Sequence, residues 1–348
     1  MPSFRTARVT EIIIERPGMQ RVRVAFEPDA DPAPDGDRAV VLTDLIGSVA
    51  VGDDVVCNTT AVQLHLGTGG WHYVHWNLAR TEHHRPGPGH VMKLRYTSLQ
   101  FDAGTSELSL TDPPPTLDST PVVACLLHSQ AMMVAATIRR LRPGARIVYV
   151  MTDGASLPLA ISDVAAEARR LGVIDASVTA GHAFGGDLEA VAVPSALTMA
   201  RHHLEADVIV VGMGPGVAGT ATALGTTSVE AAAVLDATRA LGGNPVLAVR
   251  ASSGDARDRH RGVSHHTDAV LRLTLARPLV ASVPDALRSN RWRDRFELVD
   301  IEVPDAAGVL AASRLQITTM GRDIAADPLF FRAAAAAGAL AVHHLPDP

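Results

Sequence analysis

The segment GDARDRHRGVSHHT, at 254–267, holds the densest group of side chains in the chain that could do chemistry. The candidate side chains in it are Asp255, Arg257, Asp258, Arg259, His260, Arg261, Ser264, His265 and His266. The fork-shaped guanidinium groups and a protonated histidine would bind an anion, and Ser264 has the position of an N-cap before a helix whose N-terminus adds to that attraction. Neutral imidazoles and carboxylates would instead bind a divalent metal. The alternative without a ligand is a solvated loop whose histidines cap and bridge.

A glycine-rich loop, VVGMGPGVAGT at 210–220, is the second group. Its candidate ligand-binding residues are Gly212, Gly214, Gly216, Gly219 and Thr220. The glycines match the Gly-x-Gly-x-x-Gly pattern, which allows a phosphate to approach the backbone at a helix N-terminus. The loop does not follow the first strand of its domain, and the next strand lacks the terminal acid that holds a ribose, so we do not expect NAD or FAD. A tight turn that needs positive φ angles is the alternative.

A third group joins His182 and Asp187 of GHAFGGDLEAV with Asp153 of the sequence TDG. Either acid could assist His182 or His260 in general acid–base catalysis. His182, Asp187, His260 and His265 are also the candidate ligands of a metal. A helix start at Asp187 and an Asp-Gly turn at Asp153 are the structural alternatives.

The elements that must position these groups form two domains. Residues 1–112 contain short β-branched or alternating runs separated by Gly, Pro and Asp turns, which favours a small barrel or sandwich. The stretch 28–37 is expected to be a turn within this domain. The segment TDPPPTLDSTP has four prolines in eleven residues, so we expect 113–121 to be a linker.

From 122 to 348, strand-like runs alternate with helical ones, which predicts a Rossmann-like three-layer domain around a parallel sheet. Every loop from strand to helix then emerges at the carboxyl edge, where ligands of open α/β sheets bind. The loops expected at this edge are long and rich in Gly, Asp, Arg and His, whereas RPGA, RLGVID, LEAD and LGGN, at the opposite edge, are short. This asymmetry predicts a ligand site at the carboxyl edge.

Composition narrows the classes of function. The 348 residues carry a net charge of −6, which argues against a nucleic-acid partner. No apolar run is long enough for a membrane span and the first residues do not resemble a signal peptide, so we expect a cytoplasmic protein without a membrane partner. Cys57 and Cys125 lie in apolar runs and read as buried thiols. Lys93 is the only lysine, which makes it a further candidate for ligand binding.

The chain resembles an uncharacterised bacterial family, domain of unknown function 3866. The motifs that carry the resemblance are LGTGGWHYV, GHVMKLRYTSLQ, GHAFGGDLEAV, VVGMGPGVAGT and RHRGVSHHT, and they span most of the sequence. The resemblance implies a β-rich N-terminal domain joined to a Rossmann-like domain. It implies no activity and no catalytic residue.

Two hypotheses of function follow. The first is an enzyme that acts on a small anionic metabolite, such as a phosphate ester, with a divalent metal as a possible cofactor. The second is a non-catalytic protein that binds or senses a small ligand, with the β domain as a coupling or oligomerisation surface. A homo-oligomer is compatible with both.

Overall fold

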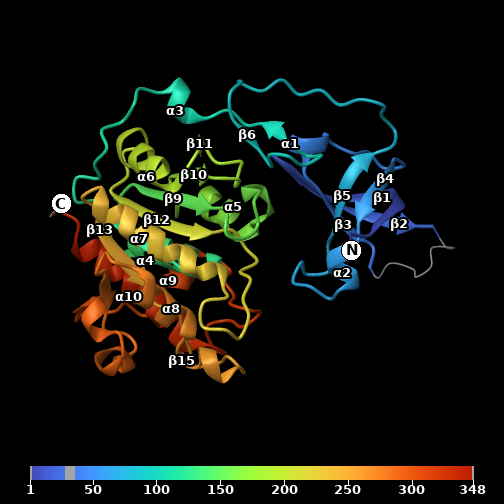
Figure 1. Ribbon diagram of the computed structural model, residues 1–348. Helices are drawn as coiled ribbons and strands as arrows, with labels where there is room; N and C mark the ends of the chain where they lie inside the picture. Colours follow the sequence, from blue (N-terminus) through green and yellow to red (C-terminus); the bar gives the residue numbers. More distant parts are fainter. Residues whose placement is uncertain (1, 28–35, 347–348) are drawn as a thin grey trace. The chain divides into compact units, whose positions relative to one another are not determined.

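The computed structural model describes residues 2–27 and 36–346, and the chain divides into two units, Met1–Asp102 and Ala103–Pro348 (Figure 1). Most of the predicted turn at 28–37 therefore lies outside the described residues. No helix in the described part of the chain has both the length and the apolar character needed to cross a bilayer.

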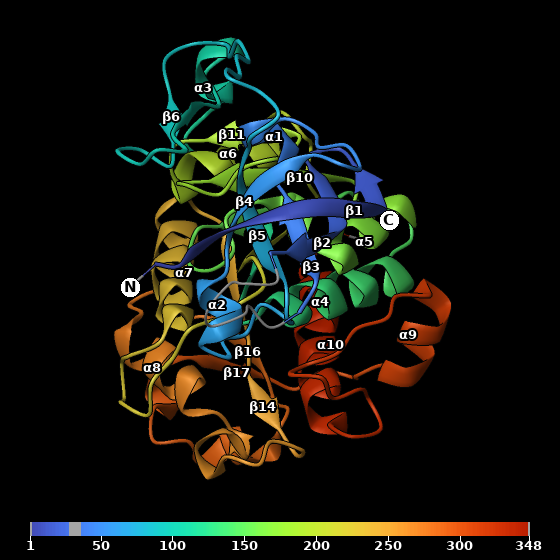
Figure 2. The same cartoon turned by 90° about the vertical axis from the view of Figure 1, so that its right-hand side faces the viewer.

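The first unit is a closed five-stranded barrel, whose strands are blue in Figure 2. Its strands are β1 (Phe4–Arg16), β2 (Met19–Phe26), β3 (Arg38–Val41), β4 (Asp54–Asn58) and β5 (His72–Asn77). They close in the order β1-β2-β3-β5-β4, with β3 and β5 parallel and the other pairs antiparallel, which is the strand order of an OB-fold. Alternate residues fill the interior, among them Val22 and Val24 of β2 and Val55 and Cys57 of β4. Of the predicted barrel and sandwich, the barrel is the one formed.

Short elements complete this unit. They are α1 (Thr43–Ile46), α2 (Thr60–Gln63) and the antiparallel pair β6 (Met92–Lys93) and β7 (Phe101–Asp102).

The proline-rich segment predicted as a linker packs instead within the second unit, and the division of the chain falls at Asp102 rather than at 112. In α3 (Ser106–Ser109), the Ser106 hydroxyl accepts a hydrogen bond from the Glu189 amide at 3.0 Å. Further along, the fully buried Leu117 donates its amide to the Leu241 carbonyl at 2.7 Å. The three consecutive prolines at 113–115 exclude a helix or a central strand there but leave Leu117 free to pack, and Pro121 is the first residue of the central strand β8.

The second unit is built on an eight-stranded sheet in the order β11-β10-β9-β12-β8-β13-β16-β17. Its strands are β8 (Pro121–Cys125), β9 (Ile147–Thr152), β10 (Ala176–Ala180), β11 (Leu188–Ala190), β12 (Val208–Met213), β13 (Asn244–Ala248), β16 (Leu279–Ala281) and β17 (Glu297–Val299). Every pairing is parallel. All residues of β8, β9, β10 and β12 are buried, as expected of strands covered on both faces. The predicted parallel α/β architecture is confirmed.

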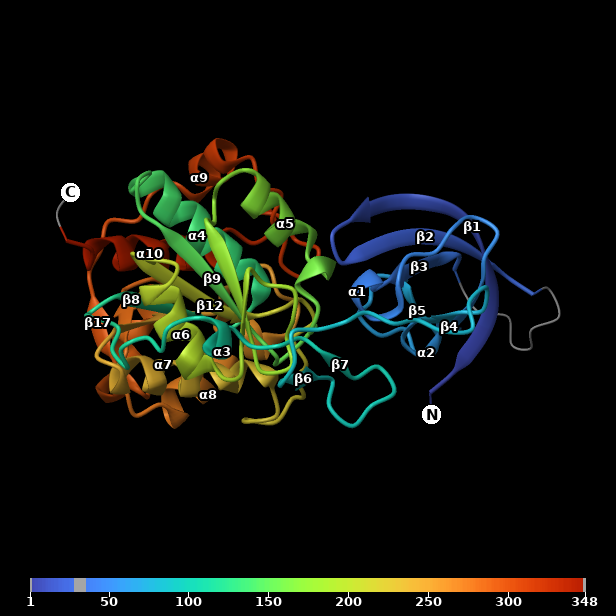
Figure 3. The ribbon, with the colours of Figure 1, turned by 90° about the horizontal axis from the view of Figure 1, so that it is seen from above.

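Helices cover both faces of the sheet (Figure 3). One face carries α4 (His128–Leu141), α5 (Asp163–Arg170), α9 (Ala306–Ser313) and α10 (Pro328–His343), and the other carries α6 (Val193–His202), α7 (Glu230–Ala240) and α8 (His265–Leu273). The connections include the 3₁₀ turns η1 (Leu159–Ile161), η2 (Thr227–Val229), η3 (Asp258–His260), η4 (Asp285–Ser289) and η5 (Arg293–Arg295).

The chain leaves two adjacent strands in opposite directions. From β8 it passes through α4 to β9, and from β12 it passes through α7 to β13, although β12 lies between β9 and β8. Because α4 and α7 lie on opposite faces of the sheet, the loops after these two strands diverge to opposite faces, and a crevice is expected between the ends of β8 and β12 at the carboxyl edge. This crevice and the loops beside it position the candidate site.

The contact between α4 and the alanine-rich α10 depends on Gly338. A Cβ atom at Gly338 would lie 2.8 Å from Thr137 Cβ and 2.9 Å from the Val134 carbonyl oxygen. We therefore expect Gly338→Ala to lower the free energy of unfolding by about 1–3 kcal/mol, because the overpacking exceeds the gain of roughly 1 kcal/mol in helix propensity. Urea denaturation measures the change. Gly144→Ala is the control, because no atom lies within 4 Å of the added Cβ there, and an equally small effect of both substitutions would contradict the close approach.

Candidate functional site

The histidine-rich loop after β13 folds back on itself through a two-stranded hairpin. β14 (Ala251–Ser252) pairs antiparallel with β15 (Gly262–Val263). The hairpin places Ser264 beside Arg250, whose carbonyl accepts a hydrogen bond from the Ser264 amide at 2.9 Å. The Thr267 hydroxyl accepts from the Arg250 amide at 3.0 Å. The end of η3 and the start of α8 therefore meet at Arg250.

Three imidazoles converge at this point. One ring nitrogen from each of His260, His265 and His266 lies within 4.8 Å of the other two. Ser264 orders the group, because its hydroxyl oxygen lies 2.8 Å from His260 Nδ1 and accepts from the His266 amide at 3.2 Å. Ser264 is thus the N-cap of α8, as its position in the sequence predicts.

Arg250 is a buried cation without a carboxylate partner. Its side chain is 4% exposed, and Nη1 donates to His266 Nδ1 at 2.8 Å. Within the described part of the chain, no carboxylate lies within ion-pair distance of Arg250. A buried guanidinium is normally paired, because burial of an unpaired charge carries a large desolvation cost.

The nearby acids are engaged by other arginines. Asp255 forms a two-pronged ion pair with Arg257, at 2.9 and 2.8 Å, and lies 3.3 Å from Arg322 Nη2. The fully buried Asp327 accepts from Arg322 Nε at 3.2 Å and from the Ser253 amide at 2.8 Å. These contacts hold the loop in place and leave Arg250 without a direct ion pair, so that Asp255 stabilises its charge only from a greater distance.

The positive surroundings keep the imidazoles neutral. Burial, together with the charge of Arg250, lowers the pKa of His260 and of His266 to about 3. Burial and the charge of Arg259 also lower the pKa of His265. The pKa of Arg250 itself falls to about 10 because of burial and the charge of Arg257, so Arg250 remains cationic at neutral pH.

The hydrogen bond between Arg250 and His266 decides which kind of ligand fits. A guanidinium cannot accept, so His266 Nδ1 is the acceptor and the proton of the neutral ring sits on Nε2. Histidines that bind metals usually donate their second ring N–H to an acceptor, which is the reverse of this arrangement. The remaining N–H groups of Arg250 and the Nε2–H of His266, which leaves the ring on the side away from Nδ1, are donors and suit an oxyanion better than a metal.

A divalent cation fits less well. His260 and His265 could each offer a ring nitrogen, and His265 Nε2 is buried with no hydrogen-bond partner. A third ligand from His266 would require its Nε2 to lose a proton beside a guanidinium. The uncompensated charge of Arg250 would also repel the metal.

The glycine-rich loop meets this cluster at Gly219. A Cβ atom there would lie 3.3 Å from His266 Nε2, so two of the predicted loops do come together. The glycines do not lead directly into a helix, because η2 begins at Thr227 and α7 at Glu230. The predicted arrangement, a phosphate held by these glycines at a helix N-terminus, is therefore wrong in its geometry.

The other candidate residues of the glycine-rich loop make contacts of other kinds. Gly212 is buried within β12, and Gly214 allows a close approach of the Ser156 carbonyl, 2.4 Å from where a Cβ atom would lie. Gly216 has φ +103° and faces open space. The Thr220 hydroxyl is 2.8 Å from that of Thr222.

His182 and Asp153 lie together but away from the imidazoles. The His182 amide donates to Asp153 Oδ2 at 2.9 Å. Their strands, β10 and β9, are four and three steps from β13 in the sheet. At about 4.8 Å per step, the strand ends are about 19 and 14 Å from that of β13. That separation exceeds hydrogen-bond reach, so the predicted composite with His260 is not assembled.

Asp187 lies at the opposite edge of the sheet. It precedes β11, which runs parallel to β10, and its carboxylate accepts from the Ser177 amide at 2.7 Å near the amino end of β10. The chain returns along the sheet after His182 and re-enters it as an added strand. Asp187 therefore lies away from the carboxyl edge, and the prediction that it joins an acid–base or metal site is wrong. The sequence gives no clear signal for this short strand.

The remaining predicted ligand-binding residues have varied positions. Arg259 and Arg261 are exposed near the cluster, and Arg261 Nε donates to the Asp255 carbonyl at 3.1 Å. Arg257 is neutralised by Asp255. Lys93 is buried in β6 of the first unit.

Sequence patterns alone did not indicate Arg250, Glu230 or His128. Arg250 ends the apolar run PVLAVR and resembles a residue at the surface end of a strand. Glu230 resembles an ordinary acid at the start of a helix, yet burial and the charge of Asp153 raise its pKa to about 7. His128 follows β8 at the carboxyl edge of the sheet, and this position in the sequence could have marked it as a candidate. Its Nε2 lies 2.6 Å from the Ser162 hydroxyl oxygen.

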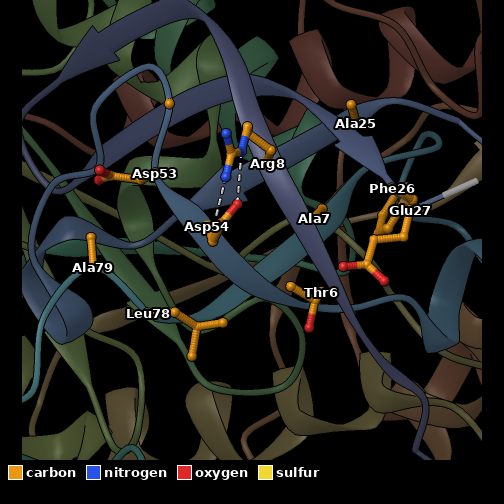
Figure 4. A pocket seen from close by; sticks show the side chains of 11 residues that line it. Thr6, Ala7, Arg8, Ala25, Phe26, Glu27, Asp53, Asp54, Leu78 and Ala79 are labelled. Carbon is orange, nitrogen blue, oxygen red and sulfur yellow. Dashed lines mark hydrogen bonds and ion pairs between the residues drawn. The ribbon is translucent and has the colours of Figure 1, made fainter.

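A surface pocket of about 510 Å³ also lies on the barrel (Figure 4). Its main charged side chains satisfy each other, because Arg8 donates to both oxygens of Asp54 at 2.9 Å. Asp53 accepts from Asn77 at 2.7 Å. These pairings leave the Arg250 cluster as the stronger candidate.

One family model matches most of the chain. The family model described as "Protein of unknown function (DUF3866)" matches residues 38–338. The chain belongs to this family. No curated protein and no solved structure matches it significantly. Membership of DUF3866 therefore assigns no reaction, and the geometry of the Arg250 cluster is the basis for a proposal.

Titration of the imidazoles predicts a pH dependence of stability. The pKa of His260 is about 3 in the folded protein, against 6.5 ordinarily, so the unfolded chain takes up the proton first as the pH falls. We expect His260→Asn to reduce the loss of unfolding free energy between pH 6 and 5 by about 1 kcal/mol per pH unit. Urea denaturation at several pH values measures this slope. The exposed His84, changed to Gln, is the control, and an unchanged slope in His260→Asn would contradict the buried neutral ring.

Proposed function

We propose that this protein binds a small oxyanion, as a phosphate ester or a carboxylate, at Arg250 and the three imidazoles, and acts on it as an enzyme. The observation that carries the proposal is the buried guanidinium of Arg250 without an acidic partner. An incoming anion would supply the missing negative charge in a site of reduced dielectric constant, where the attraction is strong.

The geometry supports two roles for the cluster. Arg250 and the Nε2–H of His266 bind the oxyanion. His260 offers a neutral ring, and with its Nδ1 proton donated to Ser264 it presents Nε2 as a proton acceptor. A neutral imidazole at physiological pH is suited to accept a proton from a hydroxyl group or a water molecule next to the bound anion.

The substitution Arg250→Met separates binding from stability. It keeps most of the side-chain volume and removes the charge, so we expect the affinity for inorganic phosphate to fall about 10- to 100-fold. The melting temperature without ligand should stay the same or rise, because an uncompensated buried charge is removed.

Isothermal titration calorimetry with inorganic phosphate and with acetate measures the affinity and distinguishes the two kinds of anion. Arg140→Met, at an exposed position on α4, is the matched control. Equal affinity of Arg250→Met and the unaltered protein for both anions would refute the proposal.

A divalent metal bound by the imidazoles is a second candidate, because three ring nitrogens lie within 4.8 Å of one another. Elemental analysis of the purified protein and titration with Zn²⁺ test it. If the anion proposal is right, the double substitution of His265 and His266 by Ala weakens phosphate binding and leaves the metal content unchanged. Metal that is bound in stoichiometric amount and lost on this double substitution would favour the second candidate.

A further inference from the structure

A crevice of about 260 Å³ opens where the crossovers from β8 and β12 diverge. Its walls come from the end of β8 and the start of α4, from α5, from the glycine-rich loop and from residues 316–320. Six apolar residues line it, Leu127, Val164, Pro215, Val217, Ile317 and Met320, together with Gly216 and five polar residues, His128, Ser129, Gln316, Thr318 and Thr319. The exposed part of the lining is mainly apolar. The lining suits an apolar group, and the volume, at the lower end for ligand sites, limits that group to a compact one.

Two short stretches of chain join this crevice to the Arg250 cluster. Val217 lines the crevice and Gly219 faces His266. Only Ala218 lies between them, so their Cα atoms are at most about 7 Å apart. On the other wall, Leu127 lines the crevice next to Leu126, whose carbonyl accepts from the Ser228 hydroxyl at 3.0 Å. That hydroxyl oxygen lies 3.2 Å from His266 Nδ1. The crevice and the cluster are therefore close neighbours along both walls.

The glycine-rich loop has few side chains between the crevice and the Arg250 cluster. Gly219 leaves room beside His266, and a Cβ atom at Gly216, where φ is +103°, would project into open space at the crevice. Both glycines lie between or beside the two regions. The loop therefore borders the crevice at Gly216 and Val217 and the cluster at Gly219.

We propose that the ligand has two parts: an oxyanion bound by Arg250 and His266, and a compact apolar group, directly attached or one or two atoms away, that occupies the crevice between β8 and β12. This inference rests on the proposed function, because it uses the same anion site. It specifies the ligand class as small aryl or short alkyl phosphates or the corresponding carboxylates. The crevice then contributes affinity and specificity without contacting the anion.

Calorimetry on the full-length chain with two probes tests this inference. We expect phenyl phosphate to bind at least about tenfold more tightly than inorganic phosphate, since the ring loses its contact with water in the crevice. Ser129→Phe should fill the crevice, abolish this preference and leave the affinity for inorganic phosphate unchanged. Ser129→Ala is the control, because it leaves the side chain small, and this variant should still prefer phenyl phosphate to inorganic phosphate.

The outcomes separate the two proposals. Equal affinity for both probes in the unaltered protein, or a preference that survives Ser129→Phe, overturns the crevice and leaves the anion site standing. Failure of inorganic phosphate and acetate to bind refutes the anion site, and phenyl phosphate binding that persists in Arg250→Met refutes the two-part ligand. If Ser129→Phe does not fold, Val164→Phe fills the crevice from α5, and its retained affinity for inorganic phosphate reports an intact anion site.

Discussion

Parallel pairing of all eight strands in the second unit constrains everything else in that unit, because it sends each strand-to-helix loop to the same edge. The loop after β13 uses this constraint in a particular way. It does not enter its helix directly but first forms the hairpin of β14 and β15, which returns Ser264 to Arg250. The helix α8 then begins beside the strand end, and three histidines that are distributed over seven residues converge.

The acids around Arg250 form ion pairs with other arginines and not with Arg250 itself. Asp255 and Asp327 are close enough to neutralise cations, but Arg257 and Arg322 engage both of them. The only hydrogen-bond partner of the Arg250 guanidinium among the described residues is a neutral imidazole. Such a site opposes folding in its empty form and gains most from an anion, which is the compromise expected where binding rather than stability has determined the residues.

The glycines of the glycine-rich loop have a different structural role from the one that their sequence pattern predicts. Its glycines do not present amides at a helix N-terminus. They allow close backbone approach at Ser156, leave space beside His266 and line the crevice. A single loop from the central strand β12 thus borders both the cationic cluster and the apolar crevice, because β12 lies next to β8 at the point where the crossovers diverge.

The sequence alone determined the parallel α/β architecture, the β-rich first domain and the edge of the sheet where polar loops gather. These features follow from hydrophobic periodicity and turn residues, which are local. It also placed Ser264 at the start of α8 and brought forward His260, His265 and His266, since they are close in the chain.

Only the tertiary structure decided which loops meet. The order of strands in the sheet could not be predicted from local sequence patterns. The insertion of β12 between β9 and β8 brings Gly219 to His266, and His182 and Asp153 remain several strands away. The added strand β11 carries Asp187 to the far edge. Arg250 is recognised only in the tertiary structure for the same reason. Whether this buried cation has a carboxylate partner depends on residues as far as 77 positions away in the sequence, such as Asp327, and on whether Arg322 already engages them.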